Sequence, residues 1–231
     1  ACALNLARSG LDLILVDVEK DTLQTLYENI SSEGFSATTI SGDCRDANVL
    51  DEIFNLAEQE FDGVDILINN VGMRDRRSIE EIDGPEFQAL LQVNLTSAFL
   101  LCREVVELMR VRQWGRIVNM SALGSAVGLK LSPSYAASKG ALESLTRTLA
   151  AALGPDGITV NALAPGFFAT ETNAALVADE TLCQKLASRT ALGRWGAPHE
   201  IAGSAVFLCS EEAAYVTGQV LTVDGGCASY F

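Results

Sequence analysis

A tyrosine and a lysine four positions apart are the residues of this sequence best suited to chemistry. Tyr135 and Lys139 lie in a run of small, helix-forming residues, YAASKGAL. Residues i and i+4 share one helix face, so both polar ends can reach the same site. A nearby positive charge favours the phenolate and lowers the pKa of a tyrosine. The pair therefore predicts a proton donor and acceptor that works near neutral pH, as interconversion of an alcohol and a carbonyl requires.

The elements around this pair follow an alternation of short β-rich runs and longer amphipathic runs, which is typical of parallel βαβ units. The sequence predicts strands at 13–16, 37–40, 65–68, 116–120, 158–162 and 220–223. It predicts helices at 21–32, 48–60, 85–111, 135–153, within 181–188 and at 198–209. No linker-like segment or internal repeat interrupts this order, so residues 1–231 are expected to form one α/β domain.

The first residues are unusual for such a fold. Residues 1–9 have apolar positions at helical spacing and Gly10 as a stop, but no N-cap precedes them. A doubly wound dinucleotide fold begins with a strand and a Gly-rich turn before this helix. We therefore expect a chain truncated within its first βαβ unit, in which the N-terminal strand and Gly-rich loop are missing.

Composition narrows the function. The chain has 231 residues and a net charge of −14, a field that would repel DNA or RNA. Its uninterrupted apolar runs are short, so no membrane association is expected. With one histidine and no paired cysteine motif, the cysteines are predicted to be free thiols in a reducing cytoplasm, without a metal site. They are Cys2, Cys44, Cys102, Cys183, Cys209 and Cys227.

Several further motifs fall in one order along the chain. They are NNVG at 69–72, VNL at 93–95, GRIVN at 115–119, YAASK at 135–139, VNALAPG at 160–166, GRWG at 193–196 and GQVLTVDGG at 218–226. With this order and spacing, essentially the whole chain resembles the short-chain dehydrogenase/reductase family. The resemblance implies a doubly wound, seven-stranded parallel-sheet Rossmann fold.

The resemblance also implies roles for individual residues. Tyr135 would exchange the proton, and Lys139 would lower the pKa of Tyr135 and bind the nicotinamide ribose. Asn94 would hold a water that links Lys139 to solvent. The family serine would lie thirteen residues before the tyrosine, but that position is Ala122. Three alternatives follow: Ser121 or Ser125 reaches the site through a different loop, Tyr135 and Lys139 act without a serine, or the activity is lost or changed. We favour a serine that reaches the site, with Ser121 as the catalytic serine.

One residue indicates the choice of cofactor independently of the family resemblance. Asp17 ends the first predicted strand, where a carboxylate binds the ribose of NAD and repels the 2′-phosphate of NADP. This favours NAD, although the missing loop could carry a residue that favours NADP. By resemblance, the other cofactor-binding residues would be Asp43, Cys44, Asn70, Val71, Gly72, Pro165, Gly166 and Thr170, together with Tyr135 and Lys139.

Two segments and a group of arginines indicate the class of substrate. Segments 165–173 and 189–196 resemble the gluconate 5-dehydrogenase branch and overlap with 3-oxoacyl-carrier-protein reductases. Arg74, Arg76 and Arg77 follow the NNVG turn, and one of them would bind a substrate carboxylate. Since acyl carrier proteins are themselves acidic, the net charge favours a free polyol, sugar acid or hydroxy acid.

Two further functions and one assembly stay open. Ala122 is compatible with a non-catalytic Rossmann protein that binds a nucleotide or partner as a sensor, and a truncated chain could be an inactive fragment. The family resemblance implies a homotetramer formed by the apolar faces of helices 95–110 and 140–153. The sequence equally allows those faces to be buried within one chain.

Overall fold

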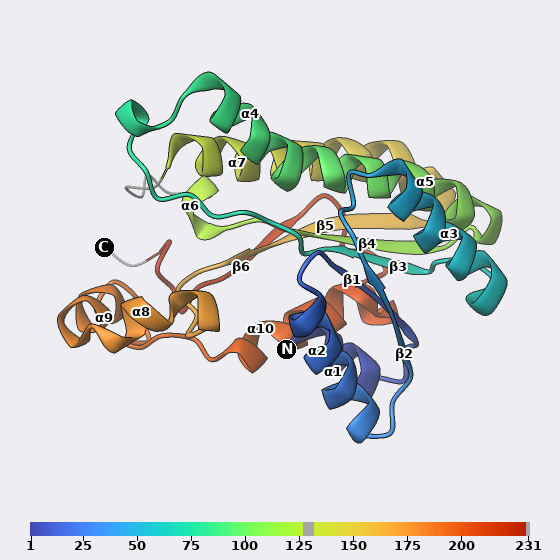
Figure 1. Cartoon of the computed structure of the whole chain (residues 1–231), viewed down its shortest axis with the longest axis horizontal. Coiled ribbons are helices and arrows are strands. Elements are labelled where there is room, and N and C mark those ends of the chain that lie inside the picture. Colours follow the sequence, from blue (N-terminus) through green and yellow to red (C-terminus); the bar gives the residue numbers. More distant parts are fainter. Residues whose placement is uncertain (127–131, 230–231) are drawn as a thin grey trace.

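Six parallel strands form the centre of the computed structural model, which describes residues 1–126 and 132–229 (Figure 1). They are β1 (Leu13–Asp17), β2 (Ala37–Ser41), β3 (Ile66–Asn69), β4 (Gly115–Met120), β5 (Ile158–Pro165) and β6 (Val220–Val223). β1 pairs with β2, and the others pair in the order β3-β4-β5-β6. All six predicted strands are confirmed. The predicted doubly wound parallel-sheet Rossmann fold is confirmed, and within the described residues its strands form two sheets, because no ladder joins β1 to β3.

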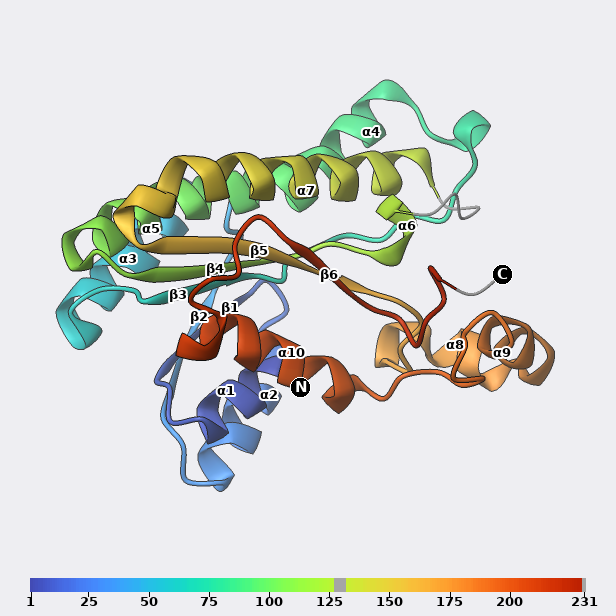
Figure 2. The same cartoon turned by 180° about the vertical axis from the view of Figure 1, so that it is seen from behind.

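Helices cover both faces of the strands (Figures 1 and 2). They are α1 (Cys2–Arg8), α2 (Lys20–Ser32), α3 (Ala47–Phe61), α4 (Gly84–Leu91), α5 (Ser97–Arg112), α6 (Leu123–Ala126), α7 (Pro133–Leu153), α8 (Ala174–Ala178), α9 (Glu180–Ala187) and α10 (Pro198–Cys209). α3, α5 and α7 lie on one face, and α1, α2 and α10 on the other. The predicted helices are confirmed, while the short α6 and α8 were not predicted.

The core lies on both sides of β4 and β5, whose residues are nearly all buried. Strands covered on both faces are buried along their whole length rather than at alternate residues. Val105 and Met109 of α5 pack with Leu153 of α7 in the cluster on one face. The apolar faces of α5 and α7 are thus largely core within this chain.

The predicted helix 85–111 is one continuous helix, but it contains a π turn. Gln92–Thr96 forms this turn between α4 and α5 and brings Asn94 to 1% exposure. By length and composition alone, the helix Gly84–Arg112 could cross a membrane. A helix of a protein core passes the same test, and here Val105 and Met109 are fully buried against the sheet.

A cavity of about 1210 Å³ separates β1 from β3. Both strands line it along their length, and it continues to the carboxyl ends of β3 and β5. Open α/β sheets bind ligands at the carboxyl ends of their strands, where the strand order reverses. This end of the cavity is therefore the natural place for a cofactor.

Candidate active site

Helix α7 carries the predicted proton-transfer pair near its N-terminus. Pro133 opens the helix, and Tyr135 and Lys139 follow one turn apart. Lys139 is 4% exposed, and its ammonium donates to the Met120 carbonyl over 2.6 Å. Burial and, to a smaller extent, the positive charge of Arg74 together lower the pKa of Lys139 to about 8. The ammonium is thus poised close to neutral pH.

The tyrosine is affected in the opposite direction from the prediction. Burial raises the pKa of Tyr135 above its usual value, because removing a phenolate from water is costly. Arg74 opposes this rise through its charge and its N–H groups. The expectation that Lys139 lowers the pKa of Tyr135 is therefore wrong here: the ammonium is bonded to Met120, and the opposing cation is Arg74.

Asn94 uses its amide to hold the segment after β3. Its Oδ1 accepts from the Met73 amide at 2.7 Å, and its Nδ2 donates to the Met73 carbonyl at 3.0 Å. Nδ2 also donates to Ser138 Oγ at 3.0 Å, on the helix that carries the pair. Asn94 thus joins the π turn, the rim of the site and α7.

The hydroxyls near the family serine position face a glutamate on α7. Ala122 is 8% exposed and offers no donor from its side chain. Ser121 Oγ donates to Glu143 Oε1 at 2.6 Å. Ser125 Oγ donates to the same Glu143 oxygen and to the Ala122 carbonyl. Both serines are thus bonded within this cluster.

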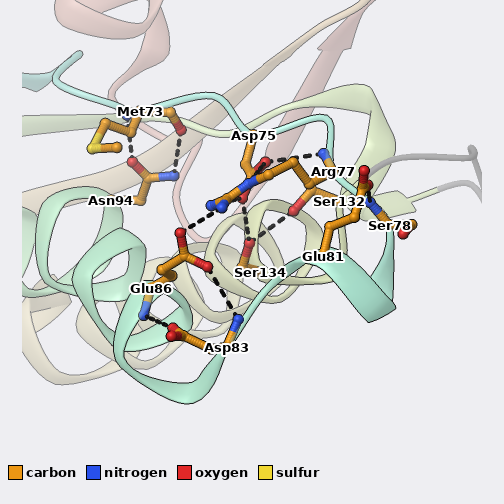
Figure 3. A network of polar contacts seen from close by, with 10 residues as sticks. All are labelled: Met73, Asp75, Arg77, Ser78, Glu81, Asp83, Glu86, Asn94, Ser132 and Ser134. Atoms are coloured by element: carbon orange, nitrogen blue, oxygen red, sulfur yellow. Dashed lines mark hydrogen bonds and ion pairs between the residues drawn. The ribbon is translucent and has the colours of Figure 1, made fainter.

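The segment 73–78 forms a rim that is fixed by ion pairs (Figure 3). Arg77 contacts Asp75 at 3.1 Å and Glu86 of α4 at 2.5 Å. Ser134, next to Tyr135, donates to Asp75 at 3.4 Å. Arg77 holds the pKa of the Asp75 carboxyl at about 2, well below its usual value. The rim thereby remains tied to α7 and α4 over a wide pH range.

Arg74 and Arg76 are arranged differently from Arg77. Arg74 Nη1 donates to Asn173 Oδ1 at 2.6 Å, and Arg76 Nη2 donates to the same oxygen at 3.3 Å. Asn173 in turn donates to the Phe168 carbonyl at 2.8 Å. Within residues 1–126 and 132–229, neither guanidinium pairs with a carboxylate. Two cations therefore share one neutral acceptor at the rim.

Most of the predicted cofactor residues line the cavity. They are Asp17, Cys44, Asn70, Val71, Pro165, Gly166 and Thr170. The Asp17 carboxylate also accepts from the Glu19 amide at 3.0 Å, at the start of α2. Asp43 instead forms an ion pair with Arg45 at 2.5 Å. Gly72 lies beside Lys139, since a side-chain carbon added there would lie 3.2 Å from Lys139 Nζ.

Two observations fit a bound nicotinamide dinucleotide. The Thr170 hydroxyl is buried, lines the cavity and has no partner among the described residues, so it is free for a polar group such as a carboxamide. Gly166 cannot be larger, because an added carbon would lie 2.6 Å from Asp224 Cα. The described residues contain no cluster of three or more His, Cys, Asp or Glu that could hold a metal ion.

A buried polar chain links the cofactor side to the catalytic helix. Asn69 Nδ2 donates to Asn119 Oδ1 at 2.8 Å, and Asn119 Nδ2 donates to Thr146 Oγ1 at 2.8 Å. Thr146 donates to the Leu142 carbonyl of α7 at 2.8 Å. Asn69 Oδ1 has no partner within the part of the chain described, and Asn69 lines the cavity.

Sequence reasoning missed Glu143, Asn173, Asn119 and Thr146. One signal was available for Glu143, which lies eight positions after Tyr135 and four after Lys139 and so shares their helix face. A glutamate on a face that packs against a sheet is uncommon unless it has a partner. Asn173 carries no comparable signal, because the fold alone brings it to Arg74.

Comparisons with known proteins agree with this geometry. The family model described as enoyl-(acyl carrier protein) reductase matches residues 1–228. Gluconate 5-dehydrogenase of Gluconobacter oxydans is 37% identical over 224 residues, covering 97% of this chain and 88% of that protein. A 3-oxoacyl-[acyl-carrier-protein] reductase of Aquifex aeolicus is 34% identical over 227 residues, covering 98% and 91%.

A solved structure extends the likeness to three dimensions. The gluconate 5-dehydrogenase of Burkholderia cenocepacia, in complex with NADP and tartrate, has a TM-score of 0.92 and 34% identity, and the match covers 100% of this chain and 90% of that one. The motifs, the parallel α/β architecture and these matches lead to one conclusion: the chain belongs to the short-chain dehydrogenase/reductase family of NAD(P)-dependent oxidoreductases.

Proposed function

We propose that this protein interconverts a secondary hydroxyl and a ketone on a small sugar acid or hydroxy acid. The observation that carries the proposal is the pair of guanidiniums, Arg74 and Arg76, that meet one neutral oxygen at the rim. The charge of Arg74 also affects the pKa of the partly buried Tyr135, so the rim and the proton-transfer pair belong to one site. Guanidinium binds carboxylate in a bidentate manner. Arg77, in contrast, is already paired with two carboxylates.

In this proposal, Tyr135 takes the proton of the hydroxyl during oxidation and returns it during reduction. Lys139 orients the ribose of the cofactor, and Asn94 holds the rim and a water that serves Lys139. A bound nicotinamide dinucleotide supplies or accepts the hydride. The residues that would hold it are Asp17, Cys44, Asn70, Val71, Gly72, Pro165, Gly166 and Thr170. Asp43 would contribute only after leaving Arg45.

The names of the relatives support an acidic substrate. Two of them are a gluconate 5-dehydrogenase and a 5-keto-D-gluconate 5-reductase, the latter of Escherichia coli. The Burkholderia structure contains tartrate, which is a hydroxy acid. The test is a panel of gluconate, 5-ketogluconate, other sugar acids and matched neutral polyols, each with NAD(H) and NADP(H). Turnover of the neutral compounds with an efficiency equal to that of the acids would contradict the proposal.

The rim arginines can be tested on the same panel. Replacing Arg76 by Gln should raise KM for acidic substrates by about tenfold or more, because a charge-assisted hydrogen bond is worth about 1.5–3 kcal/mol. KM for neutral polyols should stay the same. Arg103 on the surface of α5, which pairs with Glu104, provides the control as Arg103→Gln. An unchanged KM for acids in Arg76→Gln would rule out carboxylate binding by this residue.

For the choice of nucleotide we propose NAD, on the basis of Asp17 at the cavity. Val18 and Glu19 follow it and offer no cation to a 2′-phosphate. The Burkholderia structure contains NADP, so the choice needs its own measurement. The ratio of kcat/KM for NAD to that for NADP should exceed one and should fall at least about tenfold in Asp17→Ala. A ratio below one in the wild type would refute the assignment.

Two other functions have specific observations in their favour. The Aquifex relative suggests reduction of a 3-oxoacyl group on a carrier protein, but a net charge of −14 opposes docking of an acidic carrier. Ala122 suggests a sensor that binds nucleotide without turnover. Tight cofactor binding with no turnover of any compound in the panel would favour the sensor.

We also propose a homotetramer in the cytoplasm. Phe99 and Val111 of α5 are 45% and 86% exposed, and apolar side chains of this size are often covered in an assembly. The thiols are free in the described structure, which suits a reducing compartment. Light scattering coupled to size exclusion would test the assembly, and a monomeric mass would exclude it.

A further inference from the structure

The position that corresponds to the family serine offers no side-chain hydrogen-bond donor in this protein. In the family resemblance that donor is a serine hydroxyl, and the corresponding residue is Ala122. Ser121 and Ser125 lie close by, but both hydroxyls are bonded to Glu143, and Ser125 also to the Ala122 carbonyl. Using either serine would leave the nearly buried Glu143 carboxylate short of a partner, which is costly.

Arg74, on the rim segment after β3, offers another donor. It lines the cavity together with Gly166 and Thr170, and its positive charge opposes the rise that burial causes in the pKa of Tyr135. Within the described residues, its side-chain hydrogen bond goes to Asn173 Oδ1. A guanidinium has five N–H donors. Donors therefore remain for an atom placed next to the phenol oxygen.

We propose that Arg74 is a catalytic residue, whose guanidinium donates to the reacting substrate oxygen the hydrogen bond that a serine at position 122 would otherwise donate. The proposal rests on the proposed function, since it requires a substrate oxygen beside Tyr135. The proposal gives each of the three rim arginines a different role. Arg74 serves the reacting oxygen, Arg76 serves a substrate carboxylate, and Arg77 holds the segment in place.

The step itself balances without a proton from Arg74. During oxidation, the alcohol oxygen loses its proton to the Tyr135 oxygen, and the carbon loses a hydride, with two electrons, to the bound nicotinamide. The C–H and O–H bonds break as the carbonyl double bond forms. Arg74 stays charged and keeps all its protons, because a guanidinium does not deprotonate in proteins. It stabilises the negative charge that develops on the oxygen.

The position of Arg74 also affects the ionisation of Tyr135. The charged groups around this phenol are Arg74 from the rim, Lys139 on the same helix, and Asp75, which bonds Ser134 and is paired with Arg77. Removing the charge of Arg74 leaves burial less opposed. Tyr135 should then titrate at higher pH.

A titration of cofactor-free protein tests this part without any turnover. Tyrosinate absorbance of the wild type, Arg74→Gln and Arg76→Gln is compared with that of Tyr135→Phe to isolate Tyr135. Arg74→Gln should shift the midpoint upward, because it removes a cation that opposes the effect of burial on the phenol. Arg76→Gln, which loses the contact to the same Asn173 oxygen, is the matched control and should not shift it. Equal midpoints in all three proteins would overturn the proximity on which the proposal depends.

Turnover tests the catalytic role. Arg74→Gln should lower kcat by about a hundredfold with acidic and neutral substrates alike, as for loss of one oxyanion donor. Adding Ala122→Ser to Arg74→Gln should restore at least about tenfold, whereas Ala122→Ser alone should have a small effect. A rise in KM for acids alone, with unchanged kcat, would make Arg74 a carboxylate ligand and overturn the proposal. Failure of Ala122→Ser to restore any activity would do the same.

Two controls keep the outcomes separate. Arg74→Lys keeps the positive charge and a hydrogen-bond donor, and it should retain a higher kcat than Arg74→Gln. If both variants fold and bind cofactor but lose the same fraction of kcat, Arg74 does not act as a donor. If the wild type turns over sugar acids and Arg74→Gln does so at the same kcat, only the role of Arg74 fails. If the wild type turns over no substrate, the proposed function fails first.

Discussion

The buried ammonium of Lys139 should cost the protein stability, and this cost can be measured. Lys139 is 4% exposed and has a pKa of about 8, against an ordinary value of 10.5. Below pH 8 the lysine is charged in both the folded and the unfolded protein, and the folded state carries the full desolvation cost. Between pH 8 and 10.5 the folded protein loses this proton while the unfolded chain keeps it. Stability should therefore rise through this window.

The magnitude follows from the two pKa values. At 1.36 kcal/mol per pKa unit, a fall from 10.5 to about 8 corresponds to about 3 kcal/mol of unfolding free energy. Lys139→Met removes the titration but also leaves the Met120 carbonyl without its donor, a loss that does not depend on pH. The difference between wild type and Lys139→Met should thus shift in favour of the wild type by about 2.5 kcal/mol from pH 7 to pH 10.

Urea denaturation at several pH values between 7 and 10 gives this difference directly. Lys185→Met on α9 is the control, because Lys185 is exposed and its replacement should give a nearly constant difference. Thiols and other tyrosines titrate equally in both proteins and cancel in the comparison. A difference between wild type and Lys139→Met that stays constant over this range would refute the argument that burial of the ammonium dominates.

Three further perturbations have defined outcomes. Gly166→Ala should destabilise the protein by about 1–3 kcal/mol and weaken cofactor binding, since the new carbon would lie 2.6 Å from Asp224. Thermal denaturation measures the first effect and a fluorescence titration with the cofactor measures the second. Gly203→Ala is the control and should show neither effect, because there is open space around Gly203. Asn119→Leu should cost about 1–3 kcal/mol in urea denaturation, because it removes the acceptor of the buried Asn69 amide; an unchanged midpoint would mean that the polar chain contributes nothing. Asp75→Ala should raise KM for acids, because it releases the rim from Arg77. In the wild type the pKa of Asp75 is about 2, against an ordinary value of 3.8, so the Asp75–Arg77 ion pair should persist from pH 7 to pH 4 and weaken only as the pH falls toward 2. A wild-type KM for acids that rises between pH 7 and pH 4 would count against this role of the ion pair.

Periodicity predicted the regular elements well because their burial is regular. The bounds of α10 and β6 agree with the structure at both ends, since an apolar helix and a short apolar strand are marked by Pro198 and Gly218. The short α6 and α8 were missed, because a helix of about one turn has too few residues to show a period. The π turn at Gln92–Thr96 was missed because a predicted helix is given one uniform period of 3.6 residues.

The site was predictable where chemistry lies within one helix and unpredictable where the fold brings distant residues together. The spacing of Tyr135 and Lys139 predicted their shared face, which α7 confirms. The direction of the pKa of Tyr135 was wrong, because a sequence does not show burial. The contact of Arg74 with Asn173 joins residues 99 positions apart, and no local pattern indicates it.

The π turn has a consequence for how this chain tolerates insertions and deletions. One residue more than an α-helix holds changes the rotational phase of everything after it by about 100°. Gln92–Thr96 therefore sets the phase between α4, which anchors the rim through Glu86, and α5, which packs Val105 and Met109 into the core. Deletion of one residue in this turn would restore an ordinary helix but rotate one of the two faces away from its partner. The rim and the core are thus kept in phase by a single additional residue.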